Sequence, residues 1–328
     1  MFRHAFFLIG IVMLAQCDKE PALNARISLG KYTYHQPIMG TRFSIVLFAD
    51  NKEKADTAAR AAFKYAEEVN RTCSDYDVTS ELMQLNAAST NKPFSCSPML
   101  FDVLNSALYI AEQTDGAYDP TLGWHCFNWR IARKKNSLPT KESIAVAKAA
   151  SGWKKLRLDP QSRSVTKLVD NMRLDLGGIA KGYAADGMLS IFKDRGINRV
   201  SIIAGGEVLL GDPPPNKDGW KVTLKTLDTN YTITPKTLIK SNCAISTSGD
   251  LHQSITIADK RYSHVVSPTT GLGLTQRISA TVITDKAIMT DAMSTAFCVN
   301  PQLPHRGLMT IIVFENSAGS LESIVNNK

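Results

Sequence analysis

The chain has 328 residues, enough for one large domain or two modest ones with a substantial core. Hydrophobic residues make up 44% and charged residues 21%, so the composition excludes a disordered chain. The net charge of +8 favours an anionic partner, but lysines and arginines cluster locally only at residues 133–135, so no nucleic-acid partner is predicted.

The N-terminus has the features of an export signal. Arg3 precedes an uncharged apolar run over residues 5–15, which is too short to span a bilayer comfortably. Leu-Ala-Gln-Cys at residues 14–17 then resembles a lipobox, with residues 1–16 as signal peptide and Cys17 as the lipidated residue. An uncleaved membrane anchor is the alternative.

The residue after the lipobox predicts where the chain resides. Asp18 resembles the signal that retains bacterial lipoproteins at the inner membrane. We therefore expect a lipidated tether over residues 17–33. An exported domain over residues 34–328 is then expected at the periplasmic face of the inner membrane, held there by the lipid anchor.

Five cysteines follow Cys17, and none of them forms a CxxC pair. Neither a zinc site nor a complete disulfide framework is therefore predicted. A single disulfide is compatible with an oxidising compartment, but most of these cysteines are expected to be small buried hydrophobic residues.

The first half of the chain is predicted to hold two long helices. One follows from alanines at helical spacing, and the other begins at Ser97 and Pro98, a cap followed by a first-turn proline. In chain order the predicted elements are a strand over residues 43–48, a helix over 52–70, a helix from 97 to a stop at 116, a basic aromatic loop over 123–140, a helix over 141–150, and short strands over 156–158, 164–168 and 172–174.

Strand patterns dominate the second half. The predicted elements are a helix from residue 178 or 179 to 196, strands over 200–204, 220–227, 244–247, 262–266 and 279–284, a helix over 286–299, and a strand over 309–314. Helical and strand runs are segregated rather than alternating, so an α+β fold is predicted in preference to a doubly wound parallel sheet.

The turn Asp-Leu-Gly-Gly-Ile-Ala-Lys at residues 175–181 is the strongest local signal. Gly177 and Gly178 let the backbone approach a ligand closely, and the following helix start offers free N–H groups at the positive end of its dipole. Lys181 adds a full charge for a phosphate oxygen. The turn is a candidate phosphate site, although it is neither a Walker A loop nor a GxGxxG fingerprint, and a purely structural glycine turn is the alternative.

Asp291 and Thr295 lie four residues apart in a predicted helix and therefore share one face. A carboxylate and a hydroxyl are oxygen donors of the kind that Mg²⁺ accepts. The alternative is an ordinary surface helix that carries both groups.

His264 lies among the residues of the strand predicted over 262–266 and precedes a Pro/Gly turn. Such a histidine is a candidate general base near neutral pH, and a histidine that only satisfies local hydrogen bonds is the alternative. The turn-rich segments 114–120 and 204–207 are further candidate ligand loops.

In order, these segments resemble the ApbE family of FAD:protein FMN transferases, and the resemblance covers residues 35–315. The tracts that carry it are Met-Gly-Thr at 39–41, Ser-Asp-Tyr at 74–76 with Ser-Glu at 80–81, Asp-Gly-Ala-Tyr-Asp-Pro at 115–120, Asp-Leu-Gly-Gly-Ile-Ala-Lys-Gly-Tyr at 175–183, Ala-Gly-Gly-Glu at 204–207, Ser-Thr-Ser-Gly at 246–249, His-Val-Val-Ser-Pro at 264–268 and Thr-Asp-Ala-Met-Ser-Thr-Ala at 290–296.

The resemblance implies an α+β fold with a T-fold-like core and a smaller appended lobe. It also implies a Mg²⁺ ion held by the Gly178 carbonyl, Asp291 and Thr295. The residues that it places against FAD are Met39, Tyr76, Ala117, Tyr118, Asp119, Asp175, Lys181 and Val265.

The implied reaction moves FMN from FAD to a Thr or Ser hydroxyl of an exported acceptor, with release of AMP. The acceptors would be redox subunits with a Thr-containing flavinylation motif. His264 is the implied base, Asp291 or Asp119 being alternatives, and Lys181 would assist with the diphosphate charge. FAD hydrolysis to FMN and AMP, or non-catalytic flavin binding by a lipoprotein, are the competing functions.

The sequence departs from the family pattern at two places. Ser267 stands where the family usually has Asp, which removes a charge near the flavin region. Residues 124–135 also differ from the usual Gly- and Pro-rich continuation, so contacts to the acceptor or to the flavin ring are not assigned there.

Overall fold

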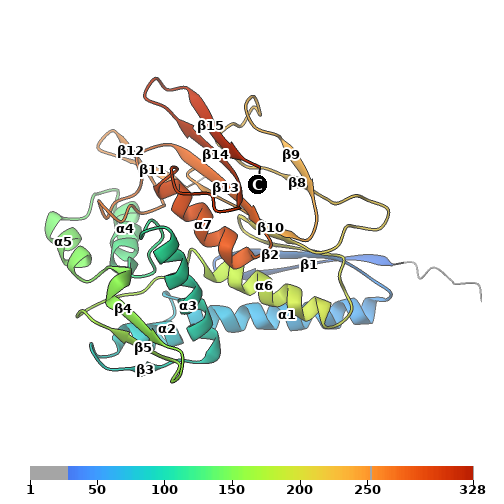
Figure 1. Ribbon diagram of the computed structural model, residues 1–328, viewed down its shortest axis with the longest axis horizontal. Coiled ribbons are helices and arrows are strands. Elements are labelled where there is room, and N and C mark those ends of the chain that lie inside the picture. Colours follow the sequence, from blue (N-terminus) through green and yellow to red (C-terminus); the bar gives the residue numbers. More distant parts are fainter. Residues whose placement is uncertain (1–28, 252, 328) are drawn as a thin grey trace, which may run out of the picture.

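The computed structural model describes residues 29–251 and 253–327. The predicted signal peptide, Cys17 and most of the predicted tether lie outside the described residues. The α+β class is confirmed, since a large antiparallel sheet is combined with helices that are grouped rather than alternating (Figure 1).

The central sheet has eight strands in the order β1-β2-β6-β7-β10-β13-β14-β15, and every neighbouring pair is antiparallel. Its strands are β1 (Gly30–Ile38), β2 (Thr41–Ala49), β6 (Val200–Ala204), β7 (Glu207–Leu210), β10 (Cys243–Gly249), β13 (Ile278–Thr284), β14 (Met309–Glu315) and β15 (Leu321–Asn326).

Three helices pack against this sheet around the main hydrophobic core: α1 (Lys52–Cys73), α6 (Ala180–Lys193) and α7 (Ala287–Val299) (Figure 1). The alanines of α1 are buried toward the sheet, which is what their helical spacing predicts. Helix α7 is buried over nearly all of its length, because it lies between α6 and the strands β10 and β13. The two helices that carry the predicted phosphate and metal residues therefore lie side by side.

A two-stranded unit, β8 (Trp220–Thr223) and β9 (Thr237–Lys240), joins a second hydrophobic cluster on the sheet. Leu224 and Leu227 belong to that cluster, although they follow the end of β8. The strand predicted over residues 220–227 is therefore too long. Beyond Thr223 the Leu224 N–H still donates to the Lys236 carbonyl at 3.1 Å, and Leu227 is buried by side-chain packing outside the strand pair.

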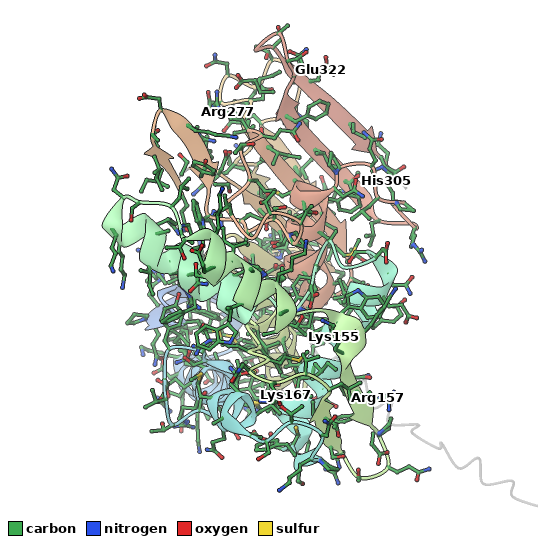
Figure 2. All side chains as sticks on the ribbon, turned by 90° about the vertical axis from the view of Figure 1, so that its left-hand side faces the viewer. Lys155, Arg157, Lys167, Arg277, His305 and Glu322 are labelled. Atoms are coloured by element: carbon green, nitrogen blue, oxygen red, sulfur yellow. The ribbon has the colours of Figure 1, made fainter. Side chains whose placement is uncertain are left out.

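The smaller lobe stands at one end of the molecule (left in Figure 1). Its elements are α2 (Glu81–Ala87), α3 (Pro98–Gln113), α4 (Gly123–Lys135), α5 (Lys141–Ala149), the 3-10 turn η1 (Trp153–Lys155), and a small sheet of β3 (Phe94–Ser95), β5 (Ser164–Lys167) and β4 (Leu156–Asp159). Figure 2 views the molecule from this end, with Lys155, Arg157 and Lys167 on the lobe and Glu322 on the distant edge strand.

The loop predicted over residues 123–140 is wrong, since most of it is the helix α4. Trp129 and Ala132 of α4 are buried against the hairpin of β11 (Ser254–Ile257) and β12 (Lys260–Ser263). Its apolar face is narrow and its last turn is basic, which hides the helical period in the sequence. The helix ends at Asn136, whose backbone is left-handed with φ 51°.

Three further predictions need correction. The expected strand over residues 172–174 is reduced to a single bridge between Arg173 and Leu122, because the segment beside it turns into helix α4 at Gly123. The strand expected over 262–266 is β12, which ends at Ser263. The tether expected to end at residue 33 overlaps β1, which begins at Gly30 and pairs with β2.

Among the described residues no helix is both long and apolar enough to cross a membrane. The five cysteines after Cys17 are free thiols, and Cys73, Cys96 and Cys298 are buried. This confirms most of them as small buried hydrophobic residues. The single disulfide considered from the sequence is not formed among them.

Candidate functional site

A cleft of about 1280 Å³ lies between the helical layer, the smaller lobe and β8. It brings together the residues that the sequence assigned to flavin, metal and catalysis. Those that line it are Met39, Tyr76, Ala117, Tyr118, Asp119, Asp175, Gly178, Lys181, His264, Val265, Asp291 and Thr295. Cys17, the predicted lipidation site, lies outside the described residues.

The glycine turn at the start of α6 is held by its own backbone and by Asp175. The Gly177 N–H donates to Asp175 Oδ1 at 2.8 Å, and the N–H groups of Ile179 and Ala180 donate to the Leu176 carbonyl. Burial raises the pKa of Asp175, the nearby charge of Asp75 adds to the rise, and Arg130 opposes it. The turn thus presents its two glycines to the cleft on a fixed frame.

Gly182 sets how closely α6 and α7 approach. A Cβ atom on Gly182 would lie 2.2 Å from the carbonyl oxygen of Ala287, so only glycine allows this contact. The close approach lets the Gly182 N–H donate to Asp291 Oδ2 at 3.1 Å. Asp186, one turn further along α6, accepts hydrogen bonds from the N–H groups of Ala287 and Ile288 and caps α7.

Lys181 and Asp291 form an ion pair across this helix contact. Lys181 Nζ lies 3.1 and 3.2 Å from the two oxygens of Asp291 and donates to the Gly177 carbonyl at 2.9 Å. The Asp291 side chain is 6% exposed and the Lys181 side chain 24%. The carboxylate is thus oriented by two donor groups, the Lys181 ammonium and the Gly182 N–H, and the ammonium group lines the cleft.

The donor set predicted for Mg²⁺ fits the geometry. In a regular helix the Gly182 N–H would donate to the Gly178 carbonyl, four residues earlier. Here this N–H donates to Asp291, and the Gly178 carbonyl has no hydrogen bond among the described residues. A Cβ on Gly178 would lie 3.7 Å from Thr295 Oγ1, so the glycine and the hydroxyl are adjacent. A carbonyl, a carboxylate and a hydroxyl are hard oxygen ligands that suit Mg²⁺.

No group of three or more His, Cys, Asp or Glu side chains that could hold a metal occurs in residues 29–251 and 253–327. The set of Gly178, Asp291 and Thr295 contains one carboxylate, and a ligand with phosphate oxygens would have to complete it.

His264 lies on the same cleft, just after β12. Its backbone N–H donates to the Gln253 carbonyl at 2.9 Å, while Nδ1 is buried without a partner among the described residues. Burial lowers the pKa of His264, and the positive charge of Arg133 lowers it further. The imidazole is therefore neutral at neutral pH and able to accept a proton.

Asp119 has a structural role that the sequence did not reveal. Its Oδ1 accepts hydrogen bonds from the N–H and hydroxyl of Thr121, and its Oδ2 accepts from the Trp153 N–H. Oδ1 thus fixes the turn at Thr121, and Oδ2 holds the start of the η1 segment beside the cleft. This use of both oxygens weakens Asp119 as an alternative base.

Ser267 also has a local role. Its Oγ accepts hydrogen bonds from the N–H groups of Thr269 and Thr270, each at 3.3 Å, and so closes the turn after the strand. A serine can therefore form the turn at this position, although it brings no charge.

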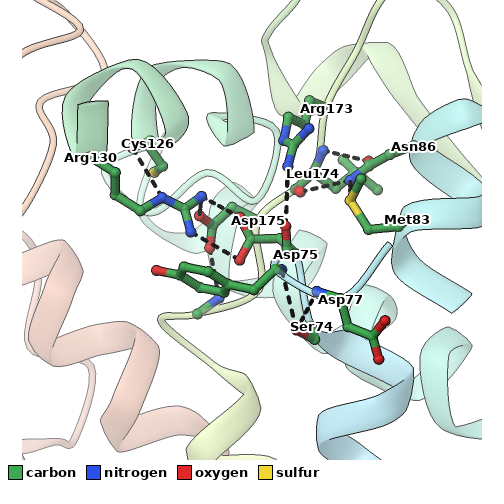
Figure 3. Close-up of polar contacts among 12 residues, drawn as sticks. Ser74, Asp75, Asp77, Met83, Asn86, Cys126, Arg130, Arg173, Leu174 and Asp175 are labelled. Carbon is green, nitrogen blue, oxygen red and sulfur yellow. Dashed lines mark hydrogen bonds and ion pairs between the residues drawn. The ribbon is translucent and has the colours of Figure 1, made fainter. Parts of the chain in front are cut away.

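Arg130 of α4 is the main cleft residue that sequence reasoning missed. It forms ion pairs with Asp75 and with Asp175, and its guanidinium carbon lies 4.4 Å from the centre of the Tyr76 ring (Figure 3). The sequence did hold a signal, since four cleft residues of α4 are spaced at i, i+3, i+4 and i+7, as one helix face requires. They are Cys126, Trp129, Arg130 and Arg133.

Glu207 is the second residue that was missed, although its tract had been noted. It is 1% exposed, its Oε1 accepts from the Thr290 hydroxyl at 2.8 Å, and its Oε2 has no partner among the described residues. Burial raises its pKa well above the usual value, and the charge of Asp291 adds to this rise. Burial and the neighbouring carboxylate of Asp291 thus both favour the protonated form of Glu207, which lies beside the residues predicted to bind Mg²⁺.

A model of the ApbE family matches residues 39–310 of the chain. Among curated proteins, an FAD:protein FMN transferase from Chlamydia muridarum is 28% identical over 299 residues, with 90% of each chain covered. A protein of the same name from Escherichia coli (strain K12) is 29% identical over 309 residues, which cover 90% of this chain and 84% of the relative.

Solved structures agree with these sequence matches. The flavin transferase ApbE from Vibrio cholerae superposes with a TM-score of 0.79 at 23% identity, covering 91% of this chain and 98% of that one, and supports the fold. An ApbE protein from Thermotoga maritima gives a TM-score of 0.77 at 27% identity, covering 89% and 96%. The shared architecture thus extends over the cleft and both of its walls.

Proposed function

The chain belongs to the ApbE family, and from this membership we propose that it is a Mg²⁺-dependent FAD:protein FMN transferase. The observation that carries the proposal is the meeting of the glycine turn, the Lys181–Asp291 pair and Thr295 in one cleft that His264 also lines. The substrate would be FAD, and the second substrate a protein with an accessible Thr or Ser hydroxyl.

In the proposed reaction the hydroxyl oxygen of the acceptor attacks the phosphorus of the FMN half of FAD. A phosphoester bond forms, the bond to the bridging oxygen breaks, and AMP leaves with that oxygen. Neutral His264 would take the hydroxyl proton, because its lowered pKa leaves the imidazole unprotonated at neutral pH. We also propose that the core of the chain is T-fold-like.

The charges of the diphosphate would be met at the α6–α7 contact. Lys181 would bind a phosphate oxygen, and Gly178, Asp291 and Thr295 would hold Mg²⁺. When bound, Mg²⁺ supplies charge neutralisation for the diphosphate and its leaving group. The α6 N-terminus adds the positive end of a helix dipole at the same place.

Water could attack the same phosphorus atom, which would make the chain an FAD diphosphatase, and a flavin-storing lipoprotein is a third function. Purified protein is mixed with FAD and Mg²⁺, with and without a Thr-bearing acceptor domain. AMP together with a covalently fluorescent acceptor is the expected result. AMP in the absence of acceptor indicates hydrolysis, whereas intact bound FAD indicates storage, and either result alone contradicts the transferase.

We also propose that the enzyme is a lipoprotein at the periplasmic face of the inner membrane, acting on exported redox subunits that carry a Thr-containing flavinylation motif. Support comes from the lipobox-like sequence that ends at Cys17. A Cys17→Ser variant should lose its membrane partitioning in cell fractionation. Unchanged partitioning would mean that the apolar segment alone anchors the chain.

A further inference from the structure

The aromatic end of the cleft is built around an exposed tyrosine. The ring of Tyr76 is 77% exposed, although it stands on the wall of the cleft. One face of the ring is covered by the guanidinium group of Arg130 at 4.4 Å. An aromatic ring that is backed by a cation on one face keeps the other face available for a planar ligand.

Three segments meet at Arg130 (Figure 3). Its Nη2 forms ion pairs with Asp75, which precedes Tyr76, and with Asp175 of the glycine turn at 3.3 Å, while its Nε donates to the Cys126 carbonyl at 3.3 Å. The side chain is 23% exposed, and those of Asp75 and Asp175 are 6% and 16% exposed. One guanidinium group thus connects three segments: the loop of Asp75 and Tyr76, the glycine turn at residues 175–181, and α4.

The two carboxylates explain why this position holds an arginine. Asp75 and Asp175 are close enough for the charge of one to raise the pKa of the other, so a cation is needed to keep both loops together. A planar guanidinium can bind two carboxylates along its edge while its face stacks on an aromatic ring. The smaller ammonium group of lysine cannot satisfy the edge and the face together.

We propose that Arg130 is a positioning residue that holds the Tyr76 ring as a stacking platform for a planar ring of FAD and joins this platform to the diphosphate turn. The proposal rests on the proposed function, because it takes FAD as the substrate. Arg130 sets the affinity for FAD and the distance between the stacked ring and the turn, whereas the chemistry belongs to the α6–α7 contact.

The first test measures FAD binding by flavin fluorescence, with Mg²⁺ and separately with EDTA. Arg130→Gln and Arg130→Lys should both weaken FAD binding about three- to tenfold, the range expected for loss of one cation–π contact in a partly desolvated site. Lys134→Gln is the matched control, because Lys134 is an exposed cation of the same helix outside the cleft. In steady state the two Arg130 variants should raise KM for FAD more than they lower kcat.

A second variant separates positioning from folding. Arg130→Gln leaves two buried carboxylates unpaired and destabilises the loops, but the double variant Arg130→Gln with Asp75→Asn removes one of those charges. We expect the double variant to recover the melting temperature while FAD binding stays weak. Full recovery of FAD binding would show that Arg130 only balances charge and would overturn the platform.

Titrations with FMN and with ADP then identify which ring stacks. The ligand that carries this ring should lose affinity in the Arg130 variants, and the other ligand should not. If the Arg130 variants bind FMN, ADP and FAD as tightly as the wild type does, the inference is overturned. A wild-type chain that binds FAD but labels no acceptor contradicts the transferase and leaves the platform supported by its binding data, whereas a chain that binds no FAD contradicts both.

Discussion

The two ends of the cleft are built in different ways. At the α6–α7 end, a glycine without space for a Cβ brings two helices together, and the reacting groups are fixed by backbone hydrogen bonds and a largely buried ion pair. At the other end, an exposed ring is held by the charges of Arg130 and two carboxylates from separate segments. The first end suits chemistry that needs fixed atoms, and the second suits binding whose strength can be tuned.

This comparison predicts that changes at the buried end act on kcat and that changes at the exposed end act on KM for FAD. Asp291→Ala should have the largest effect. It removes the carboxylate that pairs with Lys181 and that is proposed as the charged ligand of Mg²⁺, so turnover should fall by at least about a thousandfold, which corresponds to several kcal/mol of transition-state stabilisation. The measurement is the rate of acceptor labelling at saturating FAD.

Asp285→Ala is the control for Asp291→Ala. Asp285 is an exposed carboxylate just before α7 and does not line the cleft. Its replacement should leave the rate unchanged. If Asp291→Ala labels the acceptor at the wild-type rate, the ligand set and the assignment of chemistry to the α6–α7 end are both wrong.

His264→Ala should lower kcat about a hundred- to ten-thousandfold, the usual contribution of a positioned proton acceptor. Burial lowers the pKa of His264, so the unprotonated base persists to a more acidic pH than a free imidazole would allow. The wild-type rate should therefore rise with pH along a limb centred below the ordinary histidine value of about 6.5.

The pH profile of the variant decides the role. Loss of that acidic limb in His264→Ala is the expected result, and persistence of the limb would assign it to another group.

The same pKa shift has a consequence for stability. The folded state disfavours protonation of His264, so the unfolded chain binds a proton there at a higher pH than the folded chain does. The free energy of unfolding should therefore decrease as the pH falls below the pKa of His264 in the unfolded chain, and His264→Ala should not show this decrease.

The sequence allowed the buried end of the cleft to be predicted better than the exposed end. The turn at residues 175–181 and the pair Asp291 and Thr295 are local patterns, and each lies on one helix or at its start. Local spacing was therefore enough to select them. What the sequence could not give is the contact through Gly182, because its partner lies more than a hundred residues away.

The exposed end was missed for two physical reasons. Its key residue, Arg130, lies in a helix whose narrow apolar face and basic last turn make the helical spacing of its cleft residues hard to recognise in the sequence. Its partners, Asp75 and Asp175, come from two distant segments that only the tertiary fold brings together. Charges that pair over long sequence separations leave no periodic signal, so a side-chain network of this kind is seen only in the structure.

Gly182→Ala tests whether backbone contact fixes the buried end. The added Cβ would lie 2.2 Å from the Ala287 carbonyl oxygen, and backbone cannot move aside as a side chain can. We expect a loss of about 1–3 kcal/mol in the free energy of unfolding, as for other overpacked cores, together with a lower kcat. The measurements are denaturant unfolding and labelling rates.

Gly187→Ala is the matched control within α6. A Cβ at that position would meet the ring of Tyr65 at 2.0 Å, and this ring can rotate. The change should be milder, because a side chain rather than backbone has to move, while both variants gain the helix propensity of alanine over glycine, about 1 kcal/mol. If both variants lose the same stability and Gly182→Ala keeps its kcat, the close helix contact is not what fixes the site.

Asp186→Ala should have the smallest effect. It tests the α6–α7 end of the cleft by removing the side chain that caps the start of α7. Both carboxylate oxygens of Asp186 accept N–H groups at the start of α7, at 3.0 Å each, so their loss leaves two donors of that helix without partners. Loss of such a cap typically costs about 1 kcal/mol of stability. Since α7 carries Asp291 and Thr295 one and two turns later, kcat should fall modestly while KM for FAD stays the same.

Asp194→Ala is the control, because Asp194 is an exposed carboxylate at the C-terminal end of α6, and it should change neither quantity. If Asp186→Ala raises KM for FAD and leaves kcat unchanged, the α6–α7 end of the cleft binds substrate, and the roles assigned to the two ends are wrong.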